Sequence, residues 1–285
     1  MQTESMKISI LGLGLIGGSI ARSIKACDSS VYIYAVSGHM ENIDSAVLDG
    51  VIDAGGRGLS ENLRGSDVIF LTAPVEINIK YLRSLRPYLD EDTVVTDGGS
   101  VKSPIMKEAK TLGLSGCFIG GHPMAGSEKS GYKSSRADLL KDARYILTPF
   151  ENTDQTKLTK IKDIVTMTGA KALVMDAEKH DRLTAAVSHI PHIVSASLVN
   201  LVKHSDDRDG LAKEIAAGGF RDITRISSSD PEMWRQICME NRESISFLMR
   251  GYIDSLNRIL DMLENSDEDA LKSMFSDAKR YRDEI

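Results

Sequence analysis

The stretch KISILGLGLIGGS, residues 7–19, decides the fold of this chain. A short run of β-branched and apolar residues is followed by glycines in the spacing G-x-G-x-x-G and then by a helical pattern. Gly12 permits a tight turn, Gly14 lets the backbone approach a pyrophosphate, and Gly17 allows close packing of helix on strand. Glycine-rich turns of this kind also occur for structural reasons alone. In this strand–turn–helix context, the motif predicts a dinucleotide-binding turn that includes Leu15 and Ile16, at the start of a helix.

The first 175 residues alternate strand-like and helical patterns. The strand candidates are bounded by Gly, Pro, Asp and Ser, and several are apolar throughout, as expected for strands covered on both faces; they are residues 7–12, 31–36, 68–74, 93–98, 117–121 and 144–149. Helical spacing fills the gaps, for instance over residues 16–26 and 77–89. The alternation predicts an α/β fold whose N-terminal part, residues 1–175, is a doubly wound Rossmann domain with a parallel sheet.

After residue 175 the strand signals stop and helical spacing continues to the end of the chain. Ser229-Asp230-Pro231-Glu232 is typical of a helix start. Apolar residues then recur at threes and fours from Trp234 to Leu263, with Asn241 as the one polar interruption. Some thirty helical residues would extend about 50 Å. Such a long helix with a broad apolar face predicts an all-α dimerisation domain over residues 176–285 and hence a homodimer, with a monomeric bundle as the alternative.

Composition and charge exclude several classes of protein. The formal charge is -6, from 35 basic and 41 acidic residues, and no basic run is present, so nucleic acid and anionic membrane surfaces are not expected partners. No segment is expected to span a membrane: residues 8–21 are too short and glycine-rich, and residues 183–202 contain histidines, a proline and serines typical of a buried or cleft-lining helix. The three scattered cysteines favour reduced thiols. The start, MQTESMK, lacks a signal-peptide pattern, so we expect a cytoplasmic protein.

The end of the second strand bears on the choice of cofactor. An NAD site usually has Asp or Glu there to hold the ribose hydroxyls, but this chain has Ser37, with no carboxylate until Glu41. Ser37 can bond either a 2′-hydroxyl or a 2′-phosphate, and His39 can face the latter. The sequence therefore leaves NAD and NADP both open.

Two further segments follow strands and carry polar groups. TDGGSVK, residues 96–102, and GGHPMAGSE, residues 120–128, both lie where ligands bind in open α/β sheets. His122, surrounded by small residues at this crevice, is poised to take a proton near neutral pH. The alternative is a histidine whose ring is satisfied by loop carbonyls.

Together these segments resemble the prephenate/arogenate dehydrogenase family of tyrosine biosynthesis. The similarity is carried by GLGLIGGS (12–19), TDGGSVK (96–102), GGHPMAGSEKSG (120–131), HDRLTAAVSHIPH (180–192) and GGFRDITRISSSDPEMW (218–234). The resemblance implies that His122 is the catalytic base and that Ser100 orients this histidine and the substrate hydroxyl. It also implies that Arg225 binds a substrate carboxylate, that His192 and Glu128 line the pocket, and that Trp234 approaches the site from the dimer partner.

The residue types suit that reaction. Oxidation of a ring alcohol needs a base for the hydroxyl proton, and a dianionic substrate needs a guanidinium, which binds carboxylates bidentately. Arg221 and Arg225 would share a helix face, and each has a surface ion pair as its ordinary alternative; the resemblance favours Arg225. The pair His189 and His192 lacks further ligands in its pattern, so no metal site is expected. The sequence does not decide whether Asp181 caps a helix or reaches into the cleft.

The residues favour a prephenate dehydrogenase, whose substrate is the small molecule prephenate. Three alternative functions remain. Arogenate differs from prephenate by an amine in place of the side-chain ketone, and Glu128 would suit that ammonium. A sister reductase with a Rossmann domain and a helical domain predicts a catalytic lysine or a different helical signature. A non-catalytic nucleotide-binding regulator predicts loss of His122, Ser100 or Arg225, and all three are present.

Overall fold

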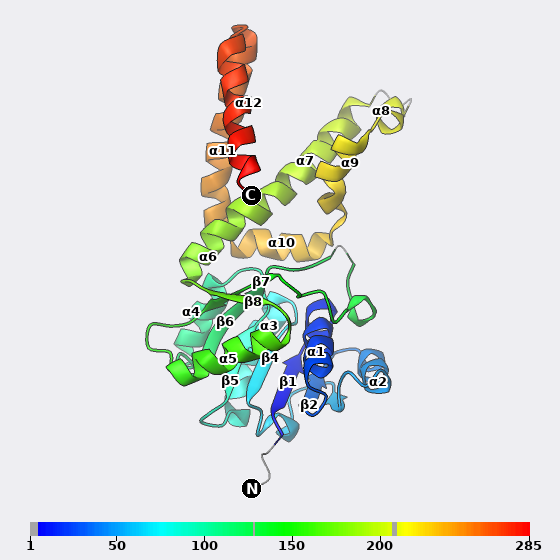
Figure 1. The fold of residues 1–285 in the computed structure, drawn as a ribbon, viewed down its shortest axis with the longest axis vertical. Helices are drawn as coiled ribbons and strands as arrows, with labels where there is room; N and C mark the ends of the chain where they lie inside the picture. Colours follow the sequence, from blue (N-terminus) through cyan, green and yellow to red (C-terminus); the bar gives the residue numbers. More distant parts are fainter. Residues whose placement is uncertain (1–4, 128, 207–209) are drawn as a thin grey trace.

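The computed structural model describes residues 5–127, 129–206 and 210–285. An eight-stranded sheet flanked by helices forms the N-terminal part, and two helical arms rise from it (Figure 1). The strands are β1 (Lys7–Leu11), β2 (Tyr32–Val36), β3 (Ala54–Gly56), β4 (Val68–Leu71), β5 (Val94–Asp97), β6 (Phe118–Pro123), β7 (Arg144–Thr148) and β8 (Lys171–Val174). All six expected strands are present.

The sheet order is β3-β2-β1-β4-β5-β6-β7-β8, and the neighbours from β3 to β6 are parallel. The expectation of a parallel sheet is wrong at one pair, because β7 runs antiparallel to β6. The described residues of the link between them form a short 3₁₀ turn, Tyr132–Ser134, and no helix that crosses a sheet face. A parallel return needs such a crossover. The helix α5 (Gln155–Met167) then supplies one, and β8 is parallel to β7.

Helices cover both faces of the sheet and give it two hydrophobic cores. One core joins alternate strand residues such as Ile8 and Ile10 to α1 (Leu15–Cys27), α2 (Met40–Leu48) and α5. The other joins residues such as Leu11 to α3 (Val75–Leu85) and α4 (Ser103–Thr111). Because both faces are buried, several strands, such as β4, are apolar throughout, as the sequence predicted.

The helical part forms two arms above the sheet (Figure 1). One arm contains α7 (Ile190–Ser205), α8 (Leu211–Glu214) and α9 (Gly218–Thr224), and the other contains α11 (Arg242–Glu264) and α12 (Glu268–Asp283). The helix α10 (Pro231–Glu240) lies across their base. Asp230 caps α10 by accepting a hydrogen bond from the N–H of Met233 at 2.8 Å.

The single long helix expected from residue 231 onward is wrong, because the chain breaks at Asn241. This residue leaves helical geometry, with φ -108° and ψ 25°, between α10 and α11. Its buried amide Nδ2 donates to the carbonyl of Asp181 at 2.7 Å and lies 3.1 Å from Nδ1 of His189. The polar residue that interrupted the apolar pattern is therefore the joint between two helices.

A continuous helical run, Ala177–Ser205, leads from the sheet into the first arm. It consists of α6 (Ala177–Thr184), a π-helical turn (Ala185–His189) and α7. By length and composition alone it is apolar enough to cross a membrane, which the sequence analysis did not expect of any segment. One such helix is weak evidence, because core helices of soluble proteins pass the same test. Here His189 and His192 of the run line a cavity beside the sheet.

Candidate active site

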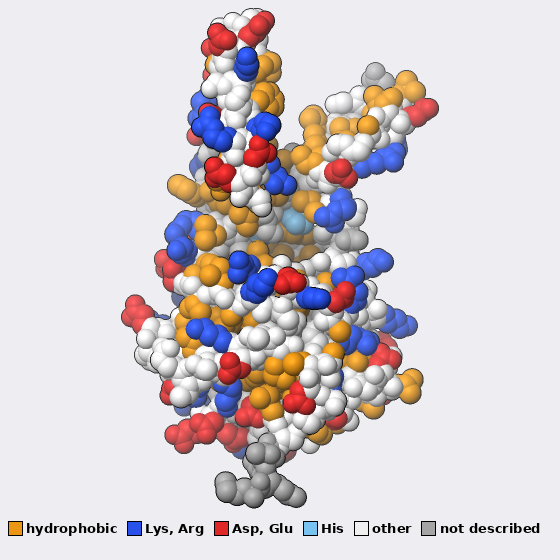
Figure 2. All heavy atoms as spheres, in the orientation of Figure 1, with side chains coloured by type: hydrophobic (Ala, Val, Ile, Leu, Met, Phe, Trp, Pro, Cys, Tyr) orange, Lys and Arg blue, Asp and Glu red, His pale blue; other side chains and the backbone are white. Residues whose placement is uncertain are grey.

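A cavity of about 450 Å³ lies between the carboxyl ends of the strands and the base of the helical arms. Figure 2 shows the molecule hollowed at this level, with a histidine side chain visible in the hollow. The cavity is lined by Leu15, Ile16, Gly98, Ser100, residues 122–127, residues 187–189, His192, Arg225, Ile226, Ser229, Met233, Trp234 and Ile237. It brings together residues from the glycine turn, from both strand-end segments and from the helical part.

The glycine turn has the geometry that a pyrophosphate requires. Gly12 has a φ of +113°, and a Cβ there would lie 2.3 Å from the backbone nitrogen of Ala73. A Cβ on Gly17 would lie 2.2 Å from the carbonyl of Gly12, so the first turn of α1 sits tightly on the strand. In contrast, nothing lies within 4 Å of a Cβ on Gly14, which leaves open space at the helix N-terminus. Leu15 and Ile16, which follow Gly14, line the cavity.

Ser37 closes the second strand beside that turn. It is buried, its N–H donates to the carbonyl of Gly56 at 3.0 Å, and its hydroxyl accepts from the N–H of His39 at 3.1 Å. Arg57 is exposed and follows Gly56, the last residue of β3, which pairs with Val36, the residue before Ser37. The nearest carboxylate along the chain, Glu41, pairs with the ring of His39 at 3.4 Å.

His122 lies at the end of β6 and is only 8% exposed. Its Nδ1 is 2.8 Å from Nε2 of His180, while the residue lines the cavity. Burial lowers the pKa of His122 well below 6.5, and the neighbouring His180, Lys102 and His189 lower it further. The imidazole is therefore neutral at neutral pH and can accept a proton.

A buried ion pair fixes the two strand-end segments against each other. Nζ of Lys102 donates to the carboxylate of Asp97 and to the carbonyl of Gly121, the latter at 2.7 Å. The same carboxylate accepts from the N–H groups of Gly99 and Gly121, each at 2.9 Å. These bonds join the loop that carries Ser100 to the strand that carries His122, so both side chains line one cavity.

The π-helical turn directs His189 inward. His189 is 1% exposed, and burial lowers its pKa to about 4. Because the amide of Asn241 donates to Nδ1, the proton of the neutral ring is on Nε2. Isolated π-turns inside helices are frequent at functional sites, and this one places a neutral donor beside the cavity.

His192 and Trp234 form the wall opposite the sheet. Their rings stack with centroids 3.8 Å apart and an interplanar angle of 25°. Trp234 lines the cavity of its own chain, on α10, which lies across the base of the arms. That Trp234 approaches the site from a dimer partner, as the resemblance implies, stays a prediction.

Arg225 begins a 3₁₀ turn, Arg225–Ser228, after α9 and lines the same cavity. It lies near enough to His192 to lower the pKa of that ring, although burial is the larger cause. Arg221, the alternative guanidinium, is not among the lining residues. Glu128 lies outside the described residues.

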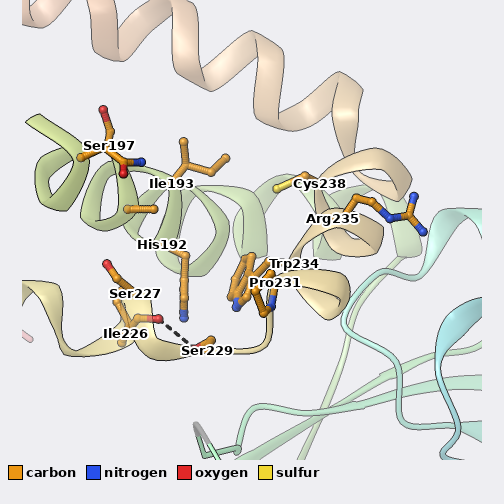
Figure 3. Close-up of a pocket in the computed structure, with 12 residues that line it drawn as sticks. His192, Ile193, Ser197, Ile226, Ser227, Ser229, Pro231, Trp234, Arg235 and Cys238 are labelled. Atoms are coloured by element: carbon orange, nitrogen blue, oxygen red, sulfur yellow. Dashed lines mark hydrogen bonds between the residues drawn. The ribbon is translucent and has the colours of Figure 1, made fainter. Parts of the chain in front are cut away.

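A second, largely apolar cavity of about 540 Å³ adjoins the first (Figure 3). His192, Trp234, Ile226 and Ser229 line both cavities. In Figure 3, His192, Trp234 and Pro231 lie side by side below α7, and the hydroxyl of Ser229 donates to the carbonyl of Ile226 at 2.8 Å. The indole Nε1 of Trp234 is buried and has no hydrogen-bond partner among the described residues.

Several residues of this site could not be assigned a role from the sequence. His180 and Asn241 were visible only as part of a motif and as a polar interruption, and Asp181 stayed open between a helix cap and a group in the cleft. Asp181 caps α4 across the fold by accepting from the N–H groups of Lys102 and Ser103, each at 2.7 Å. The sequence signal that could have indicated these residues is a cluster of polar side chains in a helical segment with few charges. Among the described residues, no group of three potential ligands is arranged to hold a metal ion.

The fold and the cavity together define a nicotinamide-dependent dehydrogenase. The features that define this class are a Rossmann sheet with a dinucleotide turn, a neutral histidine at the strand ends and a guanidinium opposite. Two family models match: "Prephenate dehydrogenase, nucleotide-binding domain" over residues 20–174 and "Prephenate dehydrogenase, dimerization domain" over residues 176–277. The chain therefore belongs to the prephenate dehydrogenase family of oxidoreductases.

Individual relatives agree along the whole chain. A prephenate dehydrogenase of Bacillus subtilis is 39% identical over 98% of this chain and 76% of its own length. The solved prephenate dehydrogenase of Aquifex aeolicus, in complex with hydroxyphenyl propionate and NAD+, is 34% identical with a TM-score of 0.91 and full coverage of both chains. The Synechocystis arogenate dehydrogenase is 32% identical with a TM-score of 0.86, over 98% of this chain and 99% of its own.

Proposed function

We propose that the chain oxidises prephenate to 4-hydroxyphenylpyruvate and carbon dioxide, with transfer of a hydride to a nicotinamide cofactor. The observation that carries this proposal is the position of His122. A neutral imidazole lies in one cavity together with Leu15 and Ile16 of the dinucleotide turn and with Arg225. Among family members the substrates are prephenate and arogenate, and we favour prephenate because the Bacillus subtilis relative carries that name.

The residues present fit a dinucleotide. The open space at Gly14 and the N-terminus of α1 would hold the pyrophosphate, and Leu15 and Ile16 would adjoin both the bound cofactor and the substrate cavity that they line. The bound nicotinamide supplies the acceptor for the hydride that leaves the ring carbon bearing the hydroxyl.

His122 would move the proton of the same step. Its Nε2 takes the hydroxyl proton as the ring carbon loses its hydride, and Ser100 orients the hydroxyl from the adjoining loop. When the bond to the ring carboxylate breaks, carbon dioxide leaves and the electron pair makes the ring aromatic. The phenolic oxygen then recovers the proton from His122. No other acid or base is required.

The other lining residues would bind the two carboxylates. Arg225 can hold one carboxylate bidentately, and the Nε2–H of His189 can donate a further hydrogen bond. His192 and Trp234 give a flat aromatic wall against which a ring can lie. Arogenate is the second candidate substrate, and the negative charge of Glu128 would suit its ammonium.

For the cofactor, we propose that NADP is accepted as well as NAD. No carboxylate ends β2 to repel a 2′-phosphate, and Ser37, His39 and Arg57 offer a hydroxyl, an imidazole and a guanidinium at that corner.

We also propose that two copies of the chain pair through residues 176–285. Only 22% of the most apolar window of the run Ala177–Ser205 is buried in one chain. Exposed apolar side chains also follow α11, namely Phe247, Ile253, Leu256, Leu260 and Leu263. Figure 2 shows hydrophobic side chains along the facing edges of the two arms. Light scattering should give the mass of a dimer, and Ile253→Asp with Leu260→Asp should shift it to that of a monomer; a wild-type monomer contradicts this proposal.

We also propose that the chain divides at residue 175 into a cofactor-binding domain, residues 1–175, and a helical substrate and dimerisation domain, residues 176–285. The cytoplasm is the compartment we propose, since Cys27, Cys117 and Cys238 are free thiols.

Absorbance at 340 nm tests the proposed reaction. The purified protein is mixed with prephenate or arogenate and with NAD or NADP, in all four combinations. We expect reduced cofactor to accumulate with prephenate. Turnover of arogenate alone would replace the proposed substrate, and no signal in any mixture would contradict the proposed function.

A further inference from the structure

A chain of three buried side chains leads away from the cavity behind His122. Nδ1 of His122 lies 2.8 Å from Nε2 of His180, and Nδ1 of His180 lies 2.8 Å from Oδ1 of Asp181. The exposed fractions of His122, His180 and Asp181 are 8%, 0% and 3%. The two rings meet edge to face, with centroids 5.0 Å apart. The chain therefore joins the sheet to α6 across two short hydrogen bonds.

The protons in this chain have one consistent arrangement. Burial opposes the charge of Asp181, but hydrogen bonds from His180 and from the N–H groups of Ser103 and Lys102 keep its pKa below the usual value. An ionised carboxylate only accepts, so Nδ1 of His180 carries the proton. With the ring proton of His180 on Nδ1, its Nε2 is the acceptor, and the proton between the two rings belongs to Nδ1 of His122. Nε2 of His122 is left unprotonated.

We propose that His180 and Asp181 are positioning residues that hold His122 in the tautomer whose Nε2 lone pair accepts the substrate proton. This inference rests on the proposed function, in which His122 is the base. With the opposite tautomer, an N–H would occupy Nε2 and no proton could be accepted there. The arrangement follows the logic by which a buried carboxylate fixes the tautomer of a catalytic histidine, with a second imidazole inserted between them.

The same chain stabilises His122 once it has gained the proton. The groups around His122 that disfavour its positive charge are His180, Lys102 and His189. Asp181 supplies the opposite charge, and His180 connects it to the ring by hydrogen bonds. Asp97 is less available for this purpose because its carboxylate is bonded to Lys102 and to the N–H groups of Gly99 and Gly121.

Two substitutions at His180 separate positioning from mere packing. His180→Leu removes the acceptor for Nδ1–H of His122, and we expect kcat to fall roughly 100-fold, the lower end of what a general base contributes, with KM within about twofold. The amide oxygen of His180→Gln can accept the same hydrogen bond, so kcat should be partly restored. A purely structural role predicts no such rescue. His204→Gln, at an exposed histidine of α7, is the matched control.

Nitrogen NMR of histidine-labelled protein reads the tautomer without any turnover. The chain has only six histidines, so single substitutions assign the signals. At neutral pH the wild type should show His122 protonated on Nδ1 and not on Nε2, and His180→Leu should lose that preference. A wild-type His122 protonated on Nε2 would overturn the proposal, as would an unchanged kcat in His180→Leu.

The two readouts also separate this inference from the proposed function. If the wild type turns over neither substrate, the proposed function fails while the NMR signals still decide the tautomer. If His180→Leu does not fold, the wild-type spectrum and His180→Gln decide it. If His180→Gln loses the Nδ1–H signal of His122 but keeps the wild-type kcat, the positioning role is contradicted.

Discussion

His192 and Trp234 stack with their ring centroids 3.8 Å apart, and the stack joins α7 to α10. Both rings line the 450 Å³ cavity beside the sheet and the 540 Å³ cavity behind it. The pair is thus a partition between two spaces, and its removal would merge them.

Replacement of Trp234 tests this partition. Trp234→Ala removes the stack and the wall, so we expect KM for prephenate to rise roughly 2- to 10-fold, as an aromatic pair contributes, with a smaller change in kcat. Trp234→Phe keeps a stacking ring and should be milder. Steady-state kinetics give both constants, and an unchanged KM in Trp234→Ala would exclude the pair from substrate binding.

Replacement of His122 tests the base. His122→Asn removes the proton acceptor, and kcat should fall roughly 10²- to 10⁴-fold while prephenate still binds. Calorimetry gives the affinity of the inactive variant, and His204→Asn serves as the control. Wild-type turnover in His122→Asn would show that another group takes the proton.

Replacement of Arg225 tests carboxylate binding. Arg225→Ala should lower kcat/KM roughly 10- to 100-fold, mostly through KM, because a hydrogen bond to a charged group is lost. Arg225→Lys keeps the charge without the bidentate geometry and should lie between. Arg221→Ala is the comparison, since that residue does not line the cavity. An equal loss in the Arg221 variant would mean that general charge, not a specific contact, holds the substrate.

A carboxylate at the end of β2 should change the cofactor preference. Ser37→Asp would accept hydrogen bonds from the ribose hydroxyls of NAD and repel the 2′-phosphate of NADP. We expect the ratio of kcat/KM for NAD over NADP to rise at least about tenfold above its wild-type value. Ser37→Asn has the same shape without the charge, and equal ratios in the two variants would argue against the repulsion.

The buried histidines should make the fold sensitive to acid. The pKa of His189 is about 4 in the folded chain and 6.5 in an ordinary environment, so below pH 6.5 the unfolded state binds the proton more readily. The stability associated with the neutral ring is complete above pH 6.5 and is lost as the pH falls towards 4, by up to about 3 kcal/mol. Melting temperatures across this range should fall less steeply for His189→Gln than for wild type. If the melting temperatures of both proteins fall equally with pH, His189 does not cause the acid sensitivity.

Much of the fold could be predicted because the central strands are buried on both faces. Their uninterrupted apolar runs are visible in the sequence, as are the glycines of the turn. In contrast, β3 consists of Ala-Gly-Gly, and all four residues of β8 are exposed, so neither carries a strand pattern. The antiparallel direction of β7 depends on the path of residues 124–143, which periodicity does not record.

The candidate site divides in the same way. Residues at the end of a strand, such as His122, or just after one, such as Ser100, could be predicted because parallel strands end at one edge of a sheet. His180 meets His122 across 58 residues of sequence, only because α6 packs above that edge. Asn241 was visible as a polar interruption, but its partners Asp181 and His189 lie on another helix.

The joint at Asn241 has a structural consequence for the proposed dimer. One amide connects the first residue before α11, which carries the exposed apolar face, to the carbonyl of Asp181 and the ring of His189. In the proposed dimer, the α11 surface that would contact the second copy therefore begins one hydrogen bond away from the backbone of Asp181 and from the ring of His189.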